Sequence, residues 1–248
     1  MQLEQMRRKA IIDANTHLYN NFRLLYCEVP KVGCSNWRRL FLVLGGHVKS
    51  PPESLSRNYV HTTPVLRSLS SYSEDEIRVR LHNYTKFLFI REPFSRMVSS
   101  YRDKLQRPNP VYHKAIGRWI LREFRPNADK SLLATGDNVT FREFAQFVIK
   151  YNNFKDRHWI PIEKICYPCD INYDFIGKIE QVAVEAPWFL QSVGVSLSYP
   201  NHQETNDSRT GVDMTKQFMQ QLSHEQRESL YKYYQRDYEI FNYSRPEL

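Results

Sequence analysis

The sequence predicts an α/β fold with a central, mostly parallel sheet flanked by helices, because short apolar strands alternate with helices along the chain. Two units of strand, loop and helix carry this prediction, the first over residues 24–44 and the second from residue 86 onward. The run at residues 86–90 is apolar on both faces, which is typical of a strand buried inside a parallel sheet. The chain of 248 residues is long enough to bury one sizeable core.

The first unit begins with the apolar run at residues 24–29, which Pro30 ends. Residues 37–44 then have the pattern of a helix that ends at a pair of glycines. A strand, a tight loop and a helix in this order leave the first helical N–H groups pointing out of the loop, with the positive end of the helix dipole behind them. The loop is therefore predicted to bind an anion.

The second unit continues into a helix, because Pro93 stands where a helix favours its first residue. This helix is expected to carry an apolar stripe formed by Phe94, Val98, Tyr101 and Leu105. An adjacent polar face is formed by Ser95, Ser99 and Arg102.

The remaining elements follow from local signals. Capping boxes predict three helix starts, at Ser73 with Glu76, Thr140 with Glu143, and Ser223 with Gln226. The first two helices are expected to reach about residues 81 and 151, and the third to cover residues 230–241. A strand is predicted at residues 173–178 and a helix at 182–193, whereas residues 1–20 are expected to form a polar, helical lead-in.

The net charge of +8 indicates a polyanionic partner without choosing among nucleic acid, anionic lipid, acidic glycan and a small phosphate-bearing cofactor. A basic but merely soluble surface explains the charge equally well. The basic residues are dispersed and match no nucleic-acid-binding module, so no nucleic acid partner is expected. No apolar run approaches the roughly 18 residues that span a membrane, so either the protein is soluble as it stands or an anchor lies upstream.

Four cysteines allow paired, partly paired and reduced states, between which the sequence does not choose. Cys166 and Cys169 have the spacing of half a zinc site, but no second pair or histidine cluster completes it. A local disulfide or plain structural cysteines are therefore expected in preference to a metal. Four N-glycosylation sequons, more than chance would supply, favour the secretory pathway; they start at Asn83, Asn138, Asn206 and Asn242.

The loop at residues 30–36 has the groups that a phosphosulfate needs. Gly33 lets the backbone approach the ligand, Ser35 and Asn36 supply donors, and Lys31 stands at the mouth. The spacing is not that of a Walker A motif, which removes the main support for an ATPase or GTPase. An ordinary turn with a solvated lysine is the alternative.

Arg91 and Ser99 predict a second anion site. Arg91 ends the second strand, at the edge where open α/β sheets bind ligands, and Ser99 lies two turns into the next helix. Together they could bind a separate phosphate, which points to a nucleotide with anionic groups at both ends of its ribose. The alternatives are a surface salt bridge for Arg91 and an ordinary helical serine for Ser99.

Two segments closely resemble the 5′-phosphosulfate and 3′-phosphate binding motifs of the HNK-1, chondroitin and GalNAc-4-O carbohydrate sulfotransferases. They are residues 27–37 (CEVPKVGCSNW) and 87–99 (FLFIREPFSRMVS). The similarity continues through residues 109–113, 166–169, 173–178 and 241–244, and so extends over nearly everything from about residue 22 onward. One departure is Arg38-Arg39, where relatives often carry a lysine and an arginine.

The resemblance implies 3′-phosphoadenosine 5′-phosphosulfate (PAPS) as the donor, a P-loop-like sulfotransferase fold and no metal requirement. It also implies a type II membrane protein whose catalytic domain lies in the Golgi lumen, with its anchor upstream of this chain. Residues 1–21 would then be a stem remnant, and residues 22–248 the catalytic domain.

The resemblance also assigns roles to individual residues. The phosphosulfate end of PAPS is expected to contact Lys31, Val32, Gly33, Cys34, Ser35, Asn36 and Trp37. Lys31 would in addition stabilise the bridging oxygen as the S–O bond breaks. Arg91 and Ser99 are expected at the 3′-phosphate. The run Ser208-Arg209-Thr210 resembles a segment that closes over the nucleotide, which makes Arg209 and Thr210 secondary candidates beside the alternative of a solvated turn.

The transfer needs a base for the acceptor proton, and histidine suits neutral or mildly acidic pH. His61 ranks first, because in the uronyl 2-O and glucosaminyl 6-O sulfotransferases a catalytic histidine similarly precedes the Arg-[Glu/Asp]-Pro strand. His158, in a His-Trp pair that resembles the family pattern, ranks second. Either histidine is alternatively a packed or surface residue.

A carbohydrate sulfotransferase is therefore the expected function, with O-4 of GalNAc in chondroitin, dermatan or a glycoprotein glycan as the favoured acceptor. Glucuronyl 3-O transfer, as in the HNK-1 epitope, is the alternative acceptor chemistry. From other classes, a non-catalytic protein that binds polyanions or glycans and a nucleotide kinase remain as alternatives.

Overall fold

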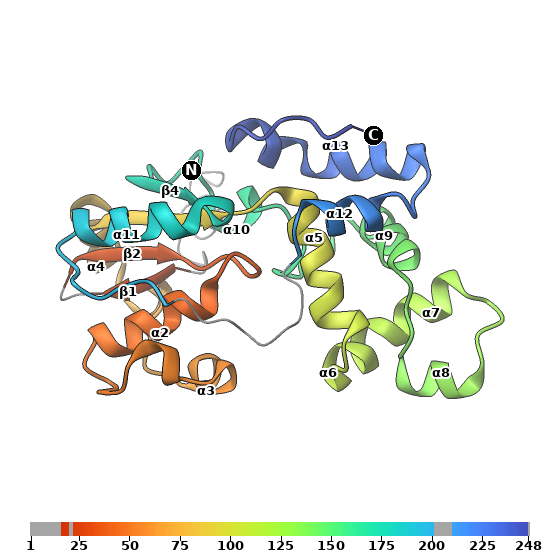
Figure 1. The fold of residues 1–248 in the computed structure, drawn as a ribbon, viewed down its shortest axis with the longest axis horizontal. Coiled ribbons are helices and arrows are strands. Elements are labelled where there is room, and N and C mark those ends of the chain that lie inside the picture. The colour runs from red at the N-terminus through yellow and green to blue at the C-terminus, as the bar shows by residue number, and fades with distance from the viewer. Residues whose placement is uncertain (1–15, 20–21, 201–209, 248) are drawn as a thin grey trace. The chain divides into compact units, whose positions relative to one another are not determined.

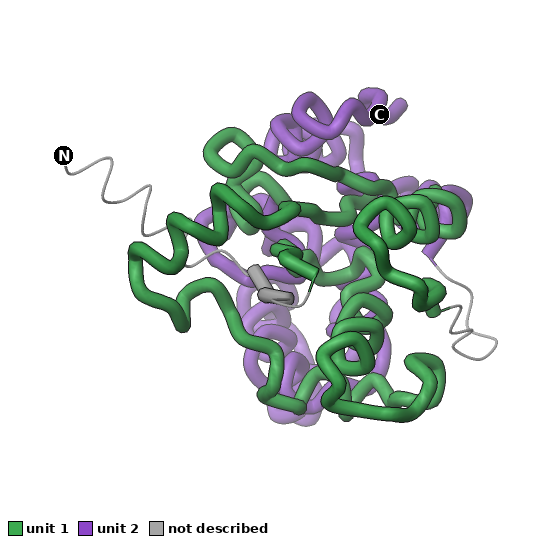
Figure 2. The backbone as a smooth tube through the Cα atoms, turned by 90° about the vertical axis from the view of Figure 1, so that its left-hand side faces the viewer, with its two compact units in different colours: residues 1–91, 162–207 green, residues 92–161, 208–248 purple. Residues whose placement is uncertain are grey.

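The computed structural model describes residues 16–19, 22–200 and 210–247. The chain divides into two compact units, residues 1–91 with 162–207 and residues 92–161 with 208–248 (Figure 2). Both units are built from two separate stretches of the chain. Each is described by itself below.

The first unit contains a four-stranded sheet in the order β1-β2-β3-β4 (Figure 1). Its strands are β1 (Thr16–Tyr19), β2 (Leu24–Cys27), β3 (Thr85–Ile90) and β4 (Phe175–Lys178). Strands β2, β3 and β4 are mutually parallel, with Tyr26 opposite Phe87 and Phe87 opposite Phe175. The predicted α/β fold with a mostly parallel sheet is confirmed.

Strand β1 corrects the prediction that residues 1–20 form a helical lead-in, because Thr16–Tyr19 is a strand. It pairs antiparallel with β2, with Thr16 opposite Cys27 and Tyr19 opposite Leu24. The segment has no strong periodicity of its own, so the edge of β2, which offers a row of backbone donors and acceptors, decides its conformation.

Five helices accompany the sheet in the described part of the first unit: α2 (Cys34–Leu44), α3 (Arg57–Thr62), α4 (Glu74–Asn83), α10 (Glu163–Cys166) and α11 (Val182–Ser192). Single 3₁₀ turns occur at Pro52–Ser54, Leu69–Ser71 and Ile179–Gln181. The capping box of Ser73 and Glu76 is confirmed at the start of α4. Helix α2 begins three residues before its predicted start, directly after Gly33.

Aromatic rings cover one face of the sheet. Tyr26, Phe87 and Phe175 lie opposite one another on three neighbouring strands. Trp37 of α2 and Phe189 of α11 both contact Phe87, at ring-centroid distances of 5.0 and 4.4 Å. On the other face, Leu25 packs with Ile77 of α4 and with Leu69. Helices therefore cover both faces of the sheet, and the aromatic layer fixes α2 on β2 and β3.

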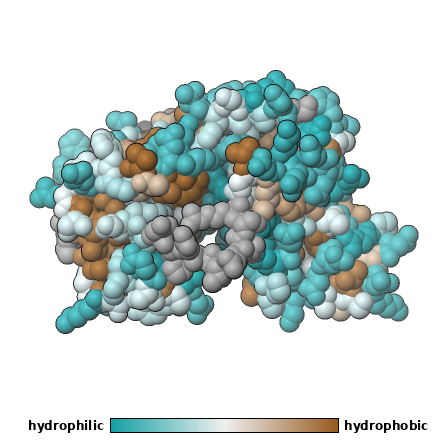
Figure 3. All heavy atoms as spheres, viewed as in Figure 1, coloured by the Kyte–Doolittle hydropathy of each residue, from teal (hydrophilic) through white to brown (hydrophobic). Residues whose placement is uncertain are grey.

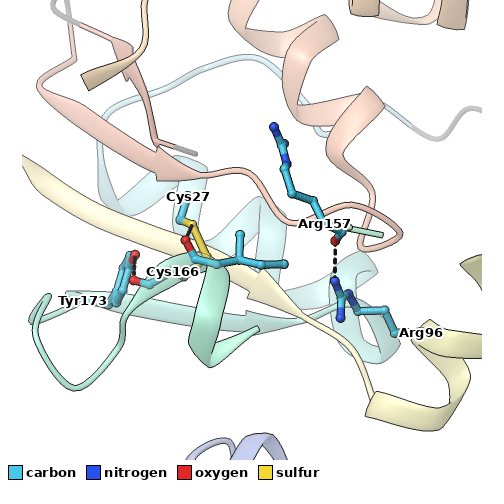
Figure 4. Close-up of a disulfide and its surroundings, with 6 residues drawn as sticks. Cys27, Arg96, Arg157, Cys166 and Tyr173 are labelled. Carbon is cyan, nitrogen blue, oxygen red and sulfur yellow. Dashed lines mark hydrogen bonds between the residues drawn. A yellow bond between two sulfur atoms is a disulfide. The ribbon is translucent and has the colours of Figure 1, made fainter. Parts of the chain in front are cut away.

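A disulfide joins Cys27, the last residue of β2, to Cys166, the last residue of α10, with a Cα–Cα distance of 5.9 Å (Figure 4). The Tyr173 hydroxyl donates to the carbonyl oxygen of Cys166 over 2.7 Å. Of the alternatives left open, a local disulfide between Cys166 and Cys169 is not formed, because the fold brings a cysteine 139 positions away next to Cys166. The local spacing of cysteines does not predict a disulfide partner so far away in the sequence.

The described part of the second unit is helical. Its helices are α5 (Pro93–Tyr101), α6 (Pro110–Tyr112), α7 (Arg118–Phe124), α8 (Lys130–Thr135), α9 (Phe141–Lys150), α12 (Val212–Met219) and α13 (His224–Ile240). Single π-helical turns follow α5 and α6, at Arg102–Gln106 and His113–Gly117. The capping boxes at Thr140 and Ser223 are confirmed, and α13 begins at His224, six residues before its predicted start.

The core of the second unit forms around α5. The predicted apolar stripe of Phe94, Val98, Tyr101 and Leu105 is buried against aromatic side chains of α9 and α13. Arg96 is also buried, and its guanidinium donates to the carbonyl oxygen of Ile160 over 2.7 Å. It also donates to the carbonyl oxygen of Arg157 over 2.8 Å (Figure 4). These bonds satisfy a charged group inside the core, as buried polar groups require.

Hydrophilic side chains predominate on the face drawn in Figure 3, with hydrophobic ones gathered in smaller areas. The most exposed large apolar side chains of the described residues include Val212, Val111, Val184 and Trp188. Among the helices of the described ranges, none combines the length and the apolar character needed to cross a membrane.

The disulfide is predicted to stabilise the first unit. Replacing Cys27 and Cys166 together by serine should lower the free energy of unfolding by about 2–5 kcal/mol, because the bond closes a long loop in the unfolded chain. Denaturant unfolding of the double variant measures this loss. A Cys169→Ser control, at an exposed position, should stay within about 0.5 kcal/mol of the wild type. Equal losses in both variants would contradict the pairing.

Candidate active site

The turn between β2 and α2 is the segment that was predicted to bind an anion. Lys31 and Gly33 both adopt left-handed backbone conformations, with φ of 72° and 85°. Gly33 is the N-cap of α2 and has no side chain to bond the first turn of the helix. The N–H groups of Cys34 and Ser35 stand in this first turn, where a helix offers no internal acceptor. The positive end of α2 therefore faces outward beside Lys31, as an anion requires.

Tyr199 and Pro200 pack on this turn. The Tyr199 hydroxyl lies 3.4 Å from the carbonyl oxygen of Gly33, and the side-chain amide of Asn36 donates to the carbonyl oxygen of Pro200 over 3.1 Å. A Cβ atom at position 33 would lie 2.6 Å from the Tyr199 hydroxyl oxygen. Both the left-handed backbone and the close approach of Tyr199 require glycine at this position.

Arg91 lies at the same edge of the sheet, one residue after β3. Its Nη1 donates to the carbonyl oxygen of Lys31 over 3.2 Å. The carboxyl ends of two parallel strands thus meet there, and the arginine predicted at the 3′-phosphate also fixes the loop predicted at the phosphosulfate.

The highest-ranked histidine stands against this loop. Nε2 of His61 and Oγ of Ser35 lie 2.8 Å apart, although 26 residues separate them in the sequence. His61 belongs to the last turn of α3, and its side chain is exposed. The structure therefore brings His61 to the loop that carries Lys31, and it leaves the His61 side chain exposed.

Arg39 attaches the segment before α3 to α2. Its Nε donates to the carbonyl oxygen of Leu55 over 2.8 Å, and its Nη1 to Oδ1 of Asn36 over 2.6 Å. Neither Arg39 nor Tyr199 was predicted as a site residue, because the bond of Arg39 to Leu55 and that of Tyr199 to Gly33 span 16 and 166 positions of the sequence. No local signal identifies such partners.

Three residues of the predicted nucleotide-binding segment, Val32, Cys34 and Trp37, have side chains that are either buried or uncharged. Val32 and Trp37 are fully buried, so any nucleotide contact they make comes from their backbone atoms. The Trp37 ring packs instead against Phe87, Phe89 and Tyr199. Burial raises the pKa of the Cys34 thiol, and the nearby Glu28 carboxylate raises it further. Cys34 therefore carries a neutral thiol at neutral pH.

The remaining predicted nucleotide contacts belong to the second unit or lie outside the described residues. Ser99 is a partly exposed residue of α5. Thr210 is buried, and its hydroxyl accepts a hydrogen bond from Nη1 of Arg102 over 2.8 Å. Arg209 lies outside the described residues. Joint binding of one nucleotide by these residues and by the loop of the first unit stays a prediction.

His158, the second-ranked histidine, belongs to a hydrogen-bonded cluster inside the second unit. Its Nδ1 lies 2.7 Å from Oδ1 of Asp156 and 2.8 Å from the Tyr112 hydroxyl, which donates to Oδ2 of Asp156 over 3.0 Å. Its carbonyl oxygen accepts from the Ser100 hydroxyl. These contacts join α5 and α6 to the 156–158 turn, and they hold Nδ1 of His158 in a hydrogen-bonded network.

The side chains of the described residues can also be compared with those that bind a metal ion. In the described ranges, no three His, Cys, Asp or Glu side chains are grouped as metal ligands. The donors at the β2–α2 turn are N–H groups and a lysine, which bind anions rather than cations.

Comparison with known proteins adds a decisive observation: the sequence profile described as the sulfotransferase family matches residues 18–244. The chain belongs to the sulfotransferase family. It is 40% identical to human carbohydrate sulfotransferase 9 over 94% of this chain and 54% of that protein. It is 41% identical to mouse carbohydrate sulfotransferase 8, over 90% of this chain and 55% of that protein. For mouse carbohydrate sulfotransferase 11 the identity is 40%, over 97% of this chain and 71% of that protein.

The chain thus spans about half the length of the first two of these relatives. No solved structure matches this sulfotransferase chain.

Replacing Gly33 by alanine is predicted to weaken binding of adenosine 3′,5′-bisphosphate (PAP), the desulfated donor, at least about tenfold. The left-handed backbone and the 2.6 Å approach of Tyr199 together force the turn to move. Gly46→Ala is the matched control, because Gly46 also has a positive φ but nothing lies within 4 Å of the place that an added Cβ atom would take. Calorimetric titration with PAP compares the two. Equal affinities would contradict a role for the turn in binding.

The cluster around His158 predicts an acid-dependent stability. Burial by itself raises the pKa of Asp156, but hydrogen bonds from His158 and Tyr112 outweigh it, so the pKa is lowered. A lowered folded-state pKa stabilises the protein above the unfolded value of about 3.9, and this contribution is lost as pH falls through the folded value. The melting-temperature difference between wild type and Asp156→Asn should therefore shrink from pH 5 to pH 3. A difference that stays constant would contradict the account.

Proposed function

We propose that this sulfotransferase chain takes a sulfuryl group from PAPS and transfers it to a carbohydrate hydroxyl. One observation carries the proposal: Nε2 of His61 lies 2.8 Å from Oγ of Ser35, at the start of α2 and in the partly exposed segment that carries Lys31. The relatives named carbohydrate sulfotransferases support a carbohydrate as the acceptor.

In this proposal the loop binds the 5′ end of PAPS through its backbone. The N–H groups of Cys34 and Ser35 bond the phosphosulfate oxygens, with the Ser35 hydroxyl beside them. Lys31 neutralises the charge that grows on the bridging oxygen. Arg91 and Ser99 bind the 3′-phosphate, and Arg209 and Thr210 cover the nucleotide.

The transfer itself is a displacement at sulfur. His61 Nε2 takes the proton of the acceptor hydroxyl as the acceptor oxygen forms its new bond to sulfur. The bond from sulfur to the bridging oxygen breaks, and its electron pair stays on the phosphate of PAP. Lys31 stabilises this leaving oxygen, so each charge that develops has a partner within the loop.

The proposed acceptor is O-4 of GalNAc, in chondroitin, dermatan or a glycoprotein glycan. The supporting observation is the amino-acid sequence of residues 27–37, which resembles the motif of GalNAc-4-O transferases more than that of the glucuronyl 3-O transferase. Transfer of labelled sulfate to a panel of desulfated acceptors, followed by disaccharide mapping, tests this choice.

We also propose that the chain works in the Golgi lumen as part of a type II membrane protein. Three sequon asparagines, Asn83, Asn138 and Asn242, are exposed. The disulfide between Cys27 and Cys166 suits an oxidising compartment. Both features support an enzyme of the secretory pathway.

The proposed roles predict distinct defects. Lys31→Ala and Arg91→Ala should each abolish transfer, because each removes a cation that binds the donor. His61→Ala should lower turnover by about 10²–10⁴ and leave PAP binding unchanged, because the base touches the acceptor. Transfer of labelled sulfate measures the first effect, and calorimetric titration with PAP measures the second.

A matched experiment separates this function from simple polyanion binding. PAP should raise the melting temperature as a specific ligand does, whereas a polyanion binder should respond to heparin without selecting PAP. Near-normal turnover by His61→Ala would remove His61 as the base. Turnover of ATP with Mg²⁺ would favour a nucleotide kinase instead.

A further inference from the structure

We propose that Arg38 is a positioning residue, whose guanidinium bridges Glu28 and the carbonyl oxygen of Val60 and thereby holds His61 at the β2–α2 loop. The inference deepens the proposed function and rests on it, since it concerns the base of that reaction. It is argued from contacts that lie wholly within the first unit.

Glu28 fixes one side of the guanidinium. This carboxylate directly follows β2 and is only 3% exposed. Nε of Arg38 donates to its Oε2 over 2.7 Å, and both side chains are largely shielded from water. A buried carboxylate without a cation would be costly, so the pair is held together and sets the orientation of the planar guanidinium.

The other side of the guanidinium faces α3. Nη1 of Arg38 donates to the carbonyl oxygen of Val60 over 3.2 Å. Val60 belongs to the last turn of α3, and the backbone N–H that would bond its carbonyl oxygen in a longer helix is missing, because residue 64 is a proline. A cation at a helix C-terminus is also favoured by the helix dipole. Arg38 therefore caps α3 at the residue directly before His61.

Helix α3 needs such a contact because it has six residues, too few to be stable in isolation. Its anchors are the buried side chain of Val60, which packs with Leu42 and Leu55, and the bond from Arg38. Arg39 holds the segment before α3, because its Nε donates to the carbonyl oxygen of Leu55. Arg38 thus fixes the backbone of α3 one residue before His61, whereas Oγ of Ser35 contacts the His61 ring itself.

The chemical consequence concerns turnover rather than donor binding. A base has to lie within hydrogen-bond reach of the proton that it takes, and a misplacement of about 1 Å can cost about 10²-fold in rate. The bond to Val60 joins Arg38 to α3 and uses neither the loop N–H groups nor the Lys31 ammonium. Loss of Arg38 should therefore lower kcat while the affinity for PAP is retained.

The test uses two variants and one control. The double variant Glu28→Gln with Arg38→Met removes the bridge without leaving an unpaired buried charge. Arg38→Lys keeps a cation for Glu28 but lacks the planar fork that reaches both partners. Arg78→Met is the matched control, because Arg78 forms an exposed pair with Asp75 on α4.

The double variant is expected to lose about 10–100-fold in kcat and to bind PAP within about threefold of the wild type. Amide hydrogen exchange at residues 57–62 should become at least about tenfold faster, and the NMR signals of the His61 ring should shift. Arg38→Lys should give intermediate values, and Arg78→Met should match the wild type in every measurement.

The proposal would be overturned if the double variant showed unchanged hydrogen exchange at residues 57–62 and unchanged NMR signals of the His61 ring. This holds whatever the sulfotransferase activity of that variant. A loss of PAP binding equal to the loss of kcat would also overturn it, because Arg38 would then act on the donor loop. Failure of the wild type to transfer sulfate would count against the proposed function instead, and the exchange and NMR results would still decide whether Arg38 positions His61.

Discussion

The left-handed backbone at Lys31 and Gly33 is the constraint on which the candidate active site depends. It lets the chain leave β2 and enter α2 within a few residues, so that the first turn of the helix faces outward. The Tyr199 hydroxyl lies so close to Gly33 that it leaves no room for a side chain at position 33. A lysine with φ of 72° is uncommon, and such strain is found where a ligand has to be held.

The surroundings hold this turn from several directions. The Trp37 ring fixes α2 on the aromatic face of the sheet. Arg91 bonds the carbonyl oxygen of Lys31, and the disulfide of Cys27 secures the end of β2. Arg38 and Arg39 attach the next segment, which carries His61. A loop held in this way changes little when a ligand binds, and preorganised donors of this kind give enzymes much of their rate advantage.

Local signals predicted much of the fold, and they singled out the segment that is proposed as the site. Three capping boxes marked helix starts, and the strand, loop and helix around Gly33 indicated an anion site before any contact was known. Long-range contacts were beyond the same reasoning. Strand β1 takes its form from the edge of β2, and Cys166 pairs with a cysteine 139 positions away. Arg38 had no predicted role, because its bond to Val60 joins residues 22 positions apart.

A crystal structure of this sulfotransferase chain with PAP bound tests the central claim most directly. The account predicts the 5′-phosphate within hydrogen-bond distance of the N–H groups of Cys34 and Ser35 and of the Lys31 ammonium. It also predicts the His61 ring facing the open side of that phosphate, where the sulfuryl group would stand. A 5′-phosphate bound away from the β2–α2 turn would contradict the account.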